Sequence, residues 1–354
     1  MTGIIGRIFR DQPVDVRFSV IGIYCILVAA NIAAWAWAYL AFHSHPVLLG
    51  TALLAYGFGL RHAVDADHIA AIDNVVRKLM QEKKRPVAVG FFFSLGHSSV
   101  VLLASVAIGL TASALQNKFA AFQKVGGIIG TAVSAFFLLV IALMNIFIMI
   151  GTYRTFSRVR NGGIYDEEDM DMILARGGLL ARLFRPLFKL IRRSWHMYPL
   201  GFLFGLGFET ATEVALLGIS ATEVSKGLPI WSMLVFPVLF TAGMSLVDTT
   251  DGILMLGAYG WAFLNPLRKL FYNLTVTAVS VVVALLIGGI ETLGLIGDQF
   301  AFAGRIWDFV RALNENFGTL GYLIIGIFAL SWLLSLAVYR AKGYDKIMIA
   351  EPAD

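Results

Sequence analysis

The sequence is poor in charged residues and has almost no cysteine. Of its 354 residues only 14% are charged, whereas 58% are hydrophobic and the mean hydropathy is +0.77. Because soluble globular proteins carry about 25% charged residues, this balance excludes an ordinary soluble protein and predicts a polytopic membrane protein. The single cysteine, Cys25, excludes a disulfide framework within one chain and a multi-cysteine metal site. Its position in an apolar run predicts a small packing residue.

Two signatures of enzymes are also missing. The chain has no G-x4-G-K-[ST] phosphate loop, so we do not expect it to hydrolyse ATP by that route, and no ATPase subunit is implied. It has no H-E-x-x-H pair of a zinc protease, and six histidines are too few for the histidine boxes of a membrane hydroxylase. We therefore expect a protein that is not an enzyme and has no cofactor, with an intramembrane metalloenzyme as a remote alternative.

Long apolar windows dominate the rest of the sequence. A helix needs roughly 20 apolar residues to cross a bilayer. Eight windows satisfy this, near residues 18–42, 47–75, 87–111, 125–150, 198–221, 230–258, 271–296 and 318–340. The sequence thus predicts an all-α integral membrane protein, with one transmembrane domain over residues 1–354, eight transmembrane helices and a long loop at 151–197.

The basic residues indicate the orientation of these helices. If the N-terminus is cytoplasmic, 22 of the 28 lysines and arginines lie in segments predicted to be inside and five lie outside. Cytoplasmic loops carry such an excess. We therefore predict that both termini and the loop 151–197 are cytoplasmic, in a multi-pass protein of the cytoplasmic (inner) membrane. The net charge of +5 is explained by these loops, so nucleic acid is not an expected partner.

One stretch within the second window, residues 61–74, is unusually polar. It holds two histidines, three aspartates and an arginine among fourteen residues. Ionisable residues inside a membrane are costly and usually mark a functional site. At 1.5 Å rise per residue, polar residues of the second, third, fifth and sixth windows fall at a similar depth. The candidate site residues are His62, Asp65, Asp67, His68, His97, Glu209, Asp248 and Asp251.

Imidazole and carboxylate groups without thiolate are typical ligands of a divalent transition metal. A regular helix, however, would separate His62 and His68 by about 9 Å along its axis and by about 120° around it. One ion could contact both histidines only if the helix is broken, and we predict a break between Gly57 and Asp67, as at many transporter sites. The alternatives to a shared ion are two successive metal sites, or one histidine that lies behind the other ligands and does not contact the ion.

Several of these residues also have structural explanations. Arg61 and Asp65 are spaced to form an ion pair, and His97 could be a hydrogen-bonded packing residue. We favour a helix-terminal or loop-anchoring role for the pair Asp73-Asn74. The segments 90–99 and 201–210 match at five of ten positions and suggest a weak internal repeat.

Four motifs together resemble the nickel/cobalt transporters of the NiCoT family. The first is His62-x4-Asp67-His68, and the others occupy residues 95–101, 206–213 and 243–252. The resemblance implies an eight-helix secondary transporter that takes up Ni²⁺ or Co²⁺ across the cytoplasmic membrane. It implies that the histidines and aspartate of the first motif are essential and that His97 and the later acids support them. Glu209 departs from the aspartate that the family usually has, which puts its role as a ligand in doubt.

The expected partners are therefore divalent transition-metal ions and the lipid bilayer. Export of the same metals, or transport of another divalent cation such as Zn²⁺ or Mn²⁺, is the alternative function. The loop 151–197 contains only one histidine, His196, whereas a histidine-rich cytoplasmic segment is common in exporters, so uptake is favoured.

Overall fold

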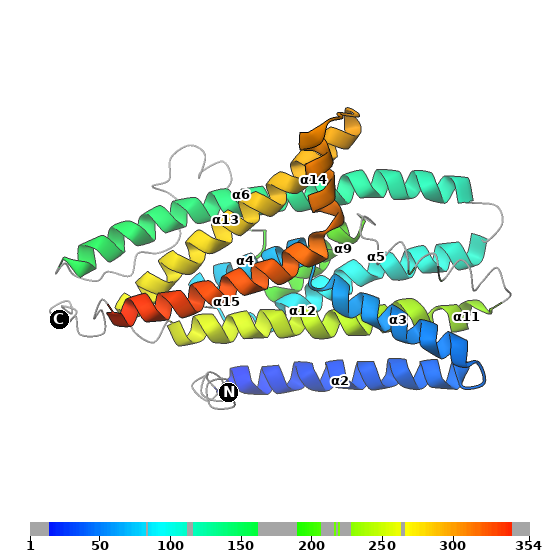
Figure 1. Ribbon diagram of the computed structural model, residues 1–354. Helices are drawn as coiled ribbons and strands as arrows, with labels where there is room; N and C mark the ends of the chain where they lie inside the picture. The colour runs from blue at the N-terminus through cyan, green and yellow to red at the C-terminus, as the bar shows by residue number, and fades with distance from the viewer. Residues whose placement is uncertain are drawn as a thin grey trace.

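The computed structural model describes residues 14–82, 84–111, 116–161, 190–206, 216, 219, 228–262 and 266–341, and its regular elements within these ranges are all helices. In chain order they are α2 (Val14–Phe42), α3 (Pro46–His62), α4 (Ala66–Gln81), α5 (Val89–Thr111), α6 (Gln116–Arg160), η1 (Ser194–His196), α9 (Met197–Gly205), α11 (Ile230–Met233), α12 (Val235–Ala262), α13 (Pro266–Gln299), α14 (Arg305–Glu315) and α15 (Phe317–Ala341). Most of the long helices run along a common direction (Figure 1).

Six of the described helices are long and apolar enough to cross a membrane, and the number is seven if α3 and α4, which are bent by 51° at their break, are counted as one span. The protein is therefore a multi-pass, all-helical membrane protein. The predicted count of eight is not reached among the described residues, because only residues 198–206, 216 and 219 are described of the window 198–221. The start of α2 and the end of α15 both lie toward the left in Figure 1.

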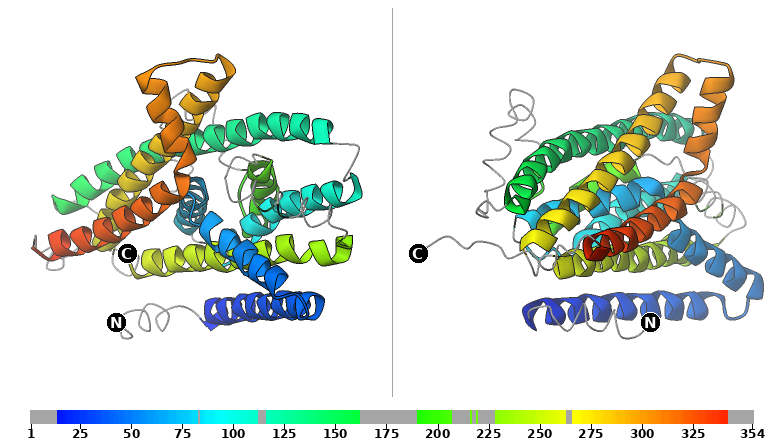
Figure 2. Two further views of the ribbon diagram at one scale, coloured as in Figure 1. Left: turned by 45° about the vertical axis from the view of Figure 1, so that its right-hand side comes forward. Right: turned by 60° about the vertical axis from the view of Figure 1, so that its left-hand side comes forward.

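The short helix α4 lies inside the bundle. Its residues from His68 to Met80 are all buried, and α5, α6, α12, α13 and α15 contact it. The left view of Figure 2 shows α4 enclosed by these longer helices. A helix as polar as α4 would be unstable against lipid, so the apolar helices around it provide the surroundings that its side chains need.

Glycines allow close packing between α5 and α9, the two elements of the suggested repeat. A Cβ on Gly96 would lie 1.9 Å from the carbonyl oxygen of Tyr198, and one on Gly201 would lie 2.1 Å from that of Phe93. Small residues at such crossings are common in membrane helices. The close contact of the two backbones thus explains why Gly96 and Gly201 are glycines.

Three details differ from the sequence-based expectations. Cys25 is exposed on α2, so its predicted packing role is wrong; α2 lies at the edge of the bundle and buries little of its surface. The helix α6 continues to Arg160, ten residues into the segment predicted as a loop. A further acid, Glu291 of α13, is buried and accepts a hydrogen bond from Ser134 of α6 at 2.8 Å.

Candidate metal centre

The polar stretch is divided by a break between α3 and α4. The helix α3 ends at His62 and α4 begins at Ala66, with Asp65 extended between them at φ −64° and ψ 147°. The backbone N–H of Val64 donates to Arg61 (3.0 Å) and that of Asp65 donates to His62 (2.9 Å), so the turn keeps its own hydrogen bonds. The predicted helix break within residues 57–67 is confirmed.

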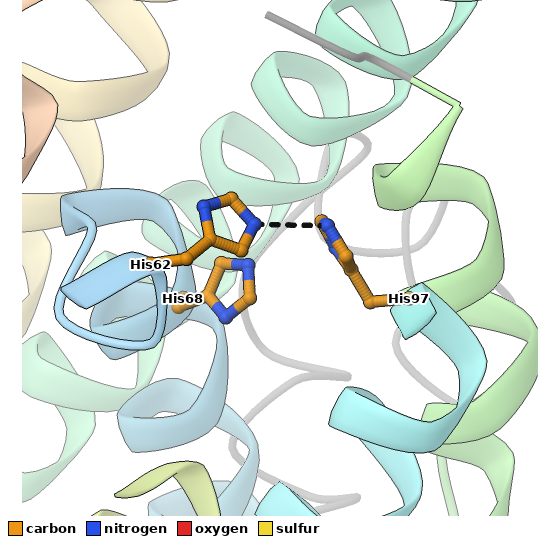
Figure 3. Close-up of side chains that lie close together, drawn as sticks. All are labelled: His62, His68 and His97. Carbon is orange, nitrogen blue, oxygen red and sulfur yellow. Dashed lines mark hydrogen bonds between the residues drawn. The ribbon is translucent and has the colours of Figure 1, made fainter. Parts of the chain in front are cut away.

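The break brings three histidines together. The ring centroids of His62 and His68 are 4.7 Å apart, and that of His97, from α5, is 4.8 Å from each. One nitrogen atom from each ring can be chosen so that all three lie within 4.8 Å of one another. Figure 3 shows His62 and His68 facing His97 across a short gap. The geometric obstacle that a regular helix presents is therefore absent.

The sequence positions His62 through the packing of α3. The buried residues of this helix are Ala52, Ala55, Gly59 and His62, spaced three or four apart along one face. This face packs against α12. The periodicity of the small residues thus directs the last residue of α3 into the protein instead of toward lipid.

Two carboxylates lie behind the histidines. The Nδ1 atom of His62 is 3.0 Å from Oδ2 of Asp65, and Nδ1 of His68 is 3.3 Å from both carboxylate oxygens of Asp248 in α12. Carboxylates in this position fix the ring orientation and the tautomer of metal-binding histidines. Asp65 is paired with His62 and not with Arg61, which is exposed at the end of α3.

The opposite ring nitrogens face the interior of the cluster. The Nε2 atoms of His62 and His97 are 2.9 Å apart (Figure 3). Nε2 of His68 is buried and has no hydrogen-bond partner among the described residues. A buried polar atom without a partner is unfavourable, and an ion bound at the cluster would provide one.

The surroundings of the cluster are apolar and closed. The three histidines, Asp65 and Asp248 are at most 3% exposed. The ring of Phe93 packs edge-on against His68 at 4.8 Å, and Phe240 lies 5.5 Å from His62. Electrostatic interactions are strong in such an environment. These two aromatic residues were not among the predicted site residues, although Phe93 precedes His97 by one helical turn.

Two of the remaining candidate residues, Asp67 and Asp251, are not part of the three-histidine group. Asp67 lies in the first turn of α4, and Asp251 lies one turn beyond Asp248 in α12. Each has a buried carboxylate oxygen that finds no hydrogen-bond partner in the described part of the chain. Glu209 lies outside the described residues.

The helix-terminal role predicted for Asp73 and Asn74 is wrong. Both are buried in the middle of α4, where Ser280 of α13 donates to Asp73 at 2.6 Å. Asn145 of α6 donates to the side-chain oxygen of Asn74 at 2.7 Å, and Arg77 donates to the same oxygen at 2.8 Å. These bonds fasten α4 to α6 and α13. The signal that was missed is a single asparagine within an apolar run of α6.

The cluster has the chemistry of a site for a divalent transition-metal ion. Imidazole suits nickel, copper, zinc and iron, and buried carboxylates behind the rings increase their basicity. When the Nε2 atoms of His62 and His97 share a hydrogen bond, one of them carries the proton. Both must present lone pairs to an ion, so a proton and a metal ion compete for this pair.

A multi-pass helical bundle with imidazoles gathered at a helix break has the features of a membrane permease for metal ions. Comparison with known sequences supports this class. The family model NicO, described as high-affinity nickel-transport protein, matches residues 48–338, and the chain belongs to this family. It is therefore a transporter of the nickel/cobalt family and not an enzyme.

Similar proteins cover nearly the whole chain. The high-affinity nickel transport protein of Cupriavidus necator is 62% identical over 329 residues, 93% of this chain and 94% of the relative. The nickel transporter NixA of Staphylococcus aureus is 45% identical over 94% of this chain and 96% of its own. The cobalt transport protein NhlF of Rhodococcus rhodochrous is 39% identical over 92% of both chains. No solved structure matches the sequence.

Proposed function

We propose that the protein is a secondary transporter that imports Ni²⁺, Co²⁺ or both across the cytoplasmic membrane, without a cofactor or an ATPase subunit. The observation that carries the proposal is the cluster of His62, His68 and His97, whose ligand nitrogens lie within 4.8 Å of one another. Membership of the nickel-transport family and the names of the similar proteins support nickel or cobalt as the substrate.

In this proposal the three Nε2 atoms bind the ion, while Asp65 and Asp248 orient two of the rings. This assigns the two aspartates a supporting role, because Oδ2 of Asp65 and both oxygens of Asp248 are already engaged with Nδ1 atoms at 3.0 and 3.3 Å. Asp67 and Asp251 have carboxylate oxygens without partners among the described residues. We propose that they attract the ion on its way to and from the cluster. A role for Glu209 stays a prediction from the family resemblance.

The proposed topology has eight spans with both termini in the cytoplasm. The helix α6 ends at one end of the bundle and α11 begins at the other (Figure 1), so the chain between them, which includes α9, has to pass from one end to the other. With the basic loops inside, the potential favours entry of a divalent cation by about 4.6 kcal/mol per 100 mV. This energy is sufficient for accumulation of the ion without ATP.

The experiment is uptake of radiolabelled Ni²⁺ by cells that express the protein, with Co²⁺, Zn²⁺ and Mn²⁺ as competitors. We expect accumulation by the wild type, and background levels for His68→Ala and His97→Ala at equal amounts of inserted protein. His43→Ala is the matched control, because His43 is an exposed histidine in the turn after α2. Wild-type uptake by the His68 variant would contradict the site, and lower accumulation with the protein than without it would contradict import.

A further inference from the structure

A cavity of about 480 Å³ lies on the side of the bundle, away from the histidine cluster. Its walls are formed by α4, α6 and the segment that leads from Leu190 through η1 into α9. Apolar side chains make up most of the lining, including Phe137, Val140 and Ile141 of α6 and Leu200 of α9. A volume of this size is typical of a pocket for a small organic ligand or one lipid chain.

The cavity opens at a surface rich in cations. Leu190 and Trp195, which line it, are largely exposed. Arg192 and Arg193 follow the lining residues Leu190 and Ile191 directly and are exposed. Lys84 donates to the backbone oxygen of Arg192 at 2.9 Å, which fixes this segment beside the end of α4. The apolar cavity therefore has a positively charged rim.

One buried cation, Lys78 of α4, lines the cavity and is 2% exposed. Its ammonium group donates to the backbone oxygen of Ile191 and is paired with Glu82 at 3.6 Å. The aliphatic part of such a side chain covers apolar surface while its charge lies toward the polar end. The polarity of the cavity thus changes from apolar beside α6 to cationic at the segment 190–193.

This gradient matches the structure of an anionic phospholipid. Two further arginines, Arg154 and Arg158 near the end of α6, are also exposed. Basic residues gather on the cytoplasmic side of membrane proteins, where the leaflet contains anionic lipids. Trp195 at the opening is the kind of residue that lies at the membrane–water interface. A zwitterionic lipid would fill the cavity but carries no net negative charge to complement these cations.

We propose that this cavity is a binding site for an anionic phospholipid of the cytoplasmic leaflet, with one acyl chain between α6 and α9 and the phosphate group at Arg192 and Arg193. The proposal is independent of the proposed metal site and of the direction of transport. It predicts selective binding of anionic over zwitterionic lipid, which is a stronger claim than coverage of the surface by any lipid.

The test is native mass spectrometry of the purified full chain with added phosphatidylglycerol or phosphatidylcholine. We expect tighter binding of phosphatidylglycerol, and a reduction of at least roughly tenfold in its affinity for Arg192→Gln/Arg193→Gln. Arg154→Gln/Arg158→Gln is the matched control, because it removes the same charge from exposed arginines of α6 that lie beyond its cavity-lining residues, and it should bind as the wild type does. Leu200→Trp, which fills the cavity, should weaken binding of both lipids.

A phosphatidylglycerol with a photoreactive acyl chain gives a second, independent readout on the wild type. Cross-links should map to the lining residues of α4, of α6 and of the segment 190–203. If Arg192→Gln/Arg193→Gln and Arg154→Gln/Arg158→Gln lost phosphatidylglycerol binding equally, the effect would be one of general charge, and the proposal would be overturned. Equal binding of the two lipids by the wild type, or cross-links to other helices, would overturn it as well.

Discussion

The role of Asp248 is open to a quantitative test through Asp248→Asn. The carboxylate is completely buried, and both of its oxygens are 3.3 Å from Nδ1 of His68. The amide has nearly the same size and can still accept one hydrogen bond, but it has no charge. The substitution therefore removes the electrostatic support of His68 while leaving the packing of α12 nearly unchanged.

The expected effect is a loss of metal affinity without loss of the site. Removing an outer partner of a metal-binding histidine typically weakens binding about 10- to 100-fold, or about 1.4–2.8 kcal/mol. His68→Ala removes a proposed ligand and should cost more than this. The metal affinity of Asp248→Asn should therefore lie between that of the wild type and that of His68→Ala.

The assay is competition for Ni²⁺ between the purified protein and a coloured chelator, followed by uptake at limiting Ni²⁺. Ser245→Ala is the control, since Ser245 is another buried polar residue of α12 and its hydroxyl accepts a hydrogen bond from Ser94, not from a histidine, at 3.0 Å. Wild-type affinity of Asp248→Asn would refute the supporting role. A loss as large as that of His68→Ala would show that Asp248 is itself a ligand.

Two further substitutions test the packing of the bundle. Gly59→Ala should lower the free energy of unfolding by about 1–3 kcal/mol, and with it the thermal unfolding midpoint, because the new Cβ would lie 2.1 Å from the backbone oxygen of Phe240. Gly57→Ala is the control and should be neutral or slightly stabilising, because its Cβ would have nothing within 4 Å. Equal midpoints for the two variants would contradict the close contact at Gly59. Asn145→Ala should destabilise the protein by roughly 0.5–1.5 kcal/mol, since it removes the hydrogen bond to Asn74, and an unchanged midpoint would show that this bond contributes nothing.

The polar positions and the break between α3 and α4 could be predicted from the sequence, because each is a local conflict with the membrane. Histidines and aspartates in an apolar window have few explanations. The distance between His62 and His68 on a regular helix required a break for a shared ion, and the break lies where these residues and the glycines of α3 allow it. These inferences needed no knowledge of neighbouring helices.

The partners of the polar residues could not be predicted in this way. Whether a carboxylate faces a ring nitrogen depends on the rotation of each helix about its axis, which the packing of the whole bundle determines. Spacing alone allowed Asp65 to pair with Arg61, but the turn directs it to His62. The role of Asp73 depended on Ser280, about 200 residues away in sequence and adjacent in the structure.

The break also explains how a cation site can exist at the ends of two helices. The C-terminal end of α3, where His62 lies, carries the negative end of a helix dipole and favours a cation. The N-terminal end of α4 carries the positive end and disfavours one, but Asp65 and Asp67 lie at this end and oppose it. A continuous helix would direct His62 and His68 to different sides and would place no dipole end at this depth. The same interruption therefore aligns the imidazoles and supplies the local negative charge, which is why the polar residues of this segment are concentrated on both sides of it.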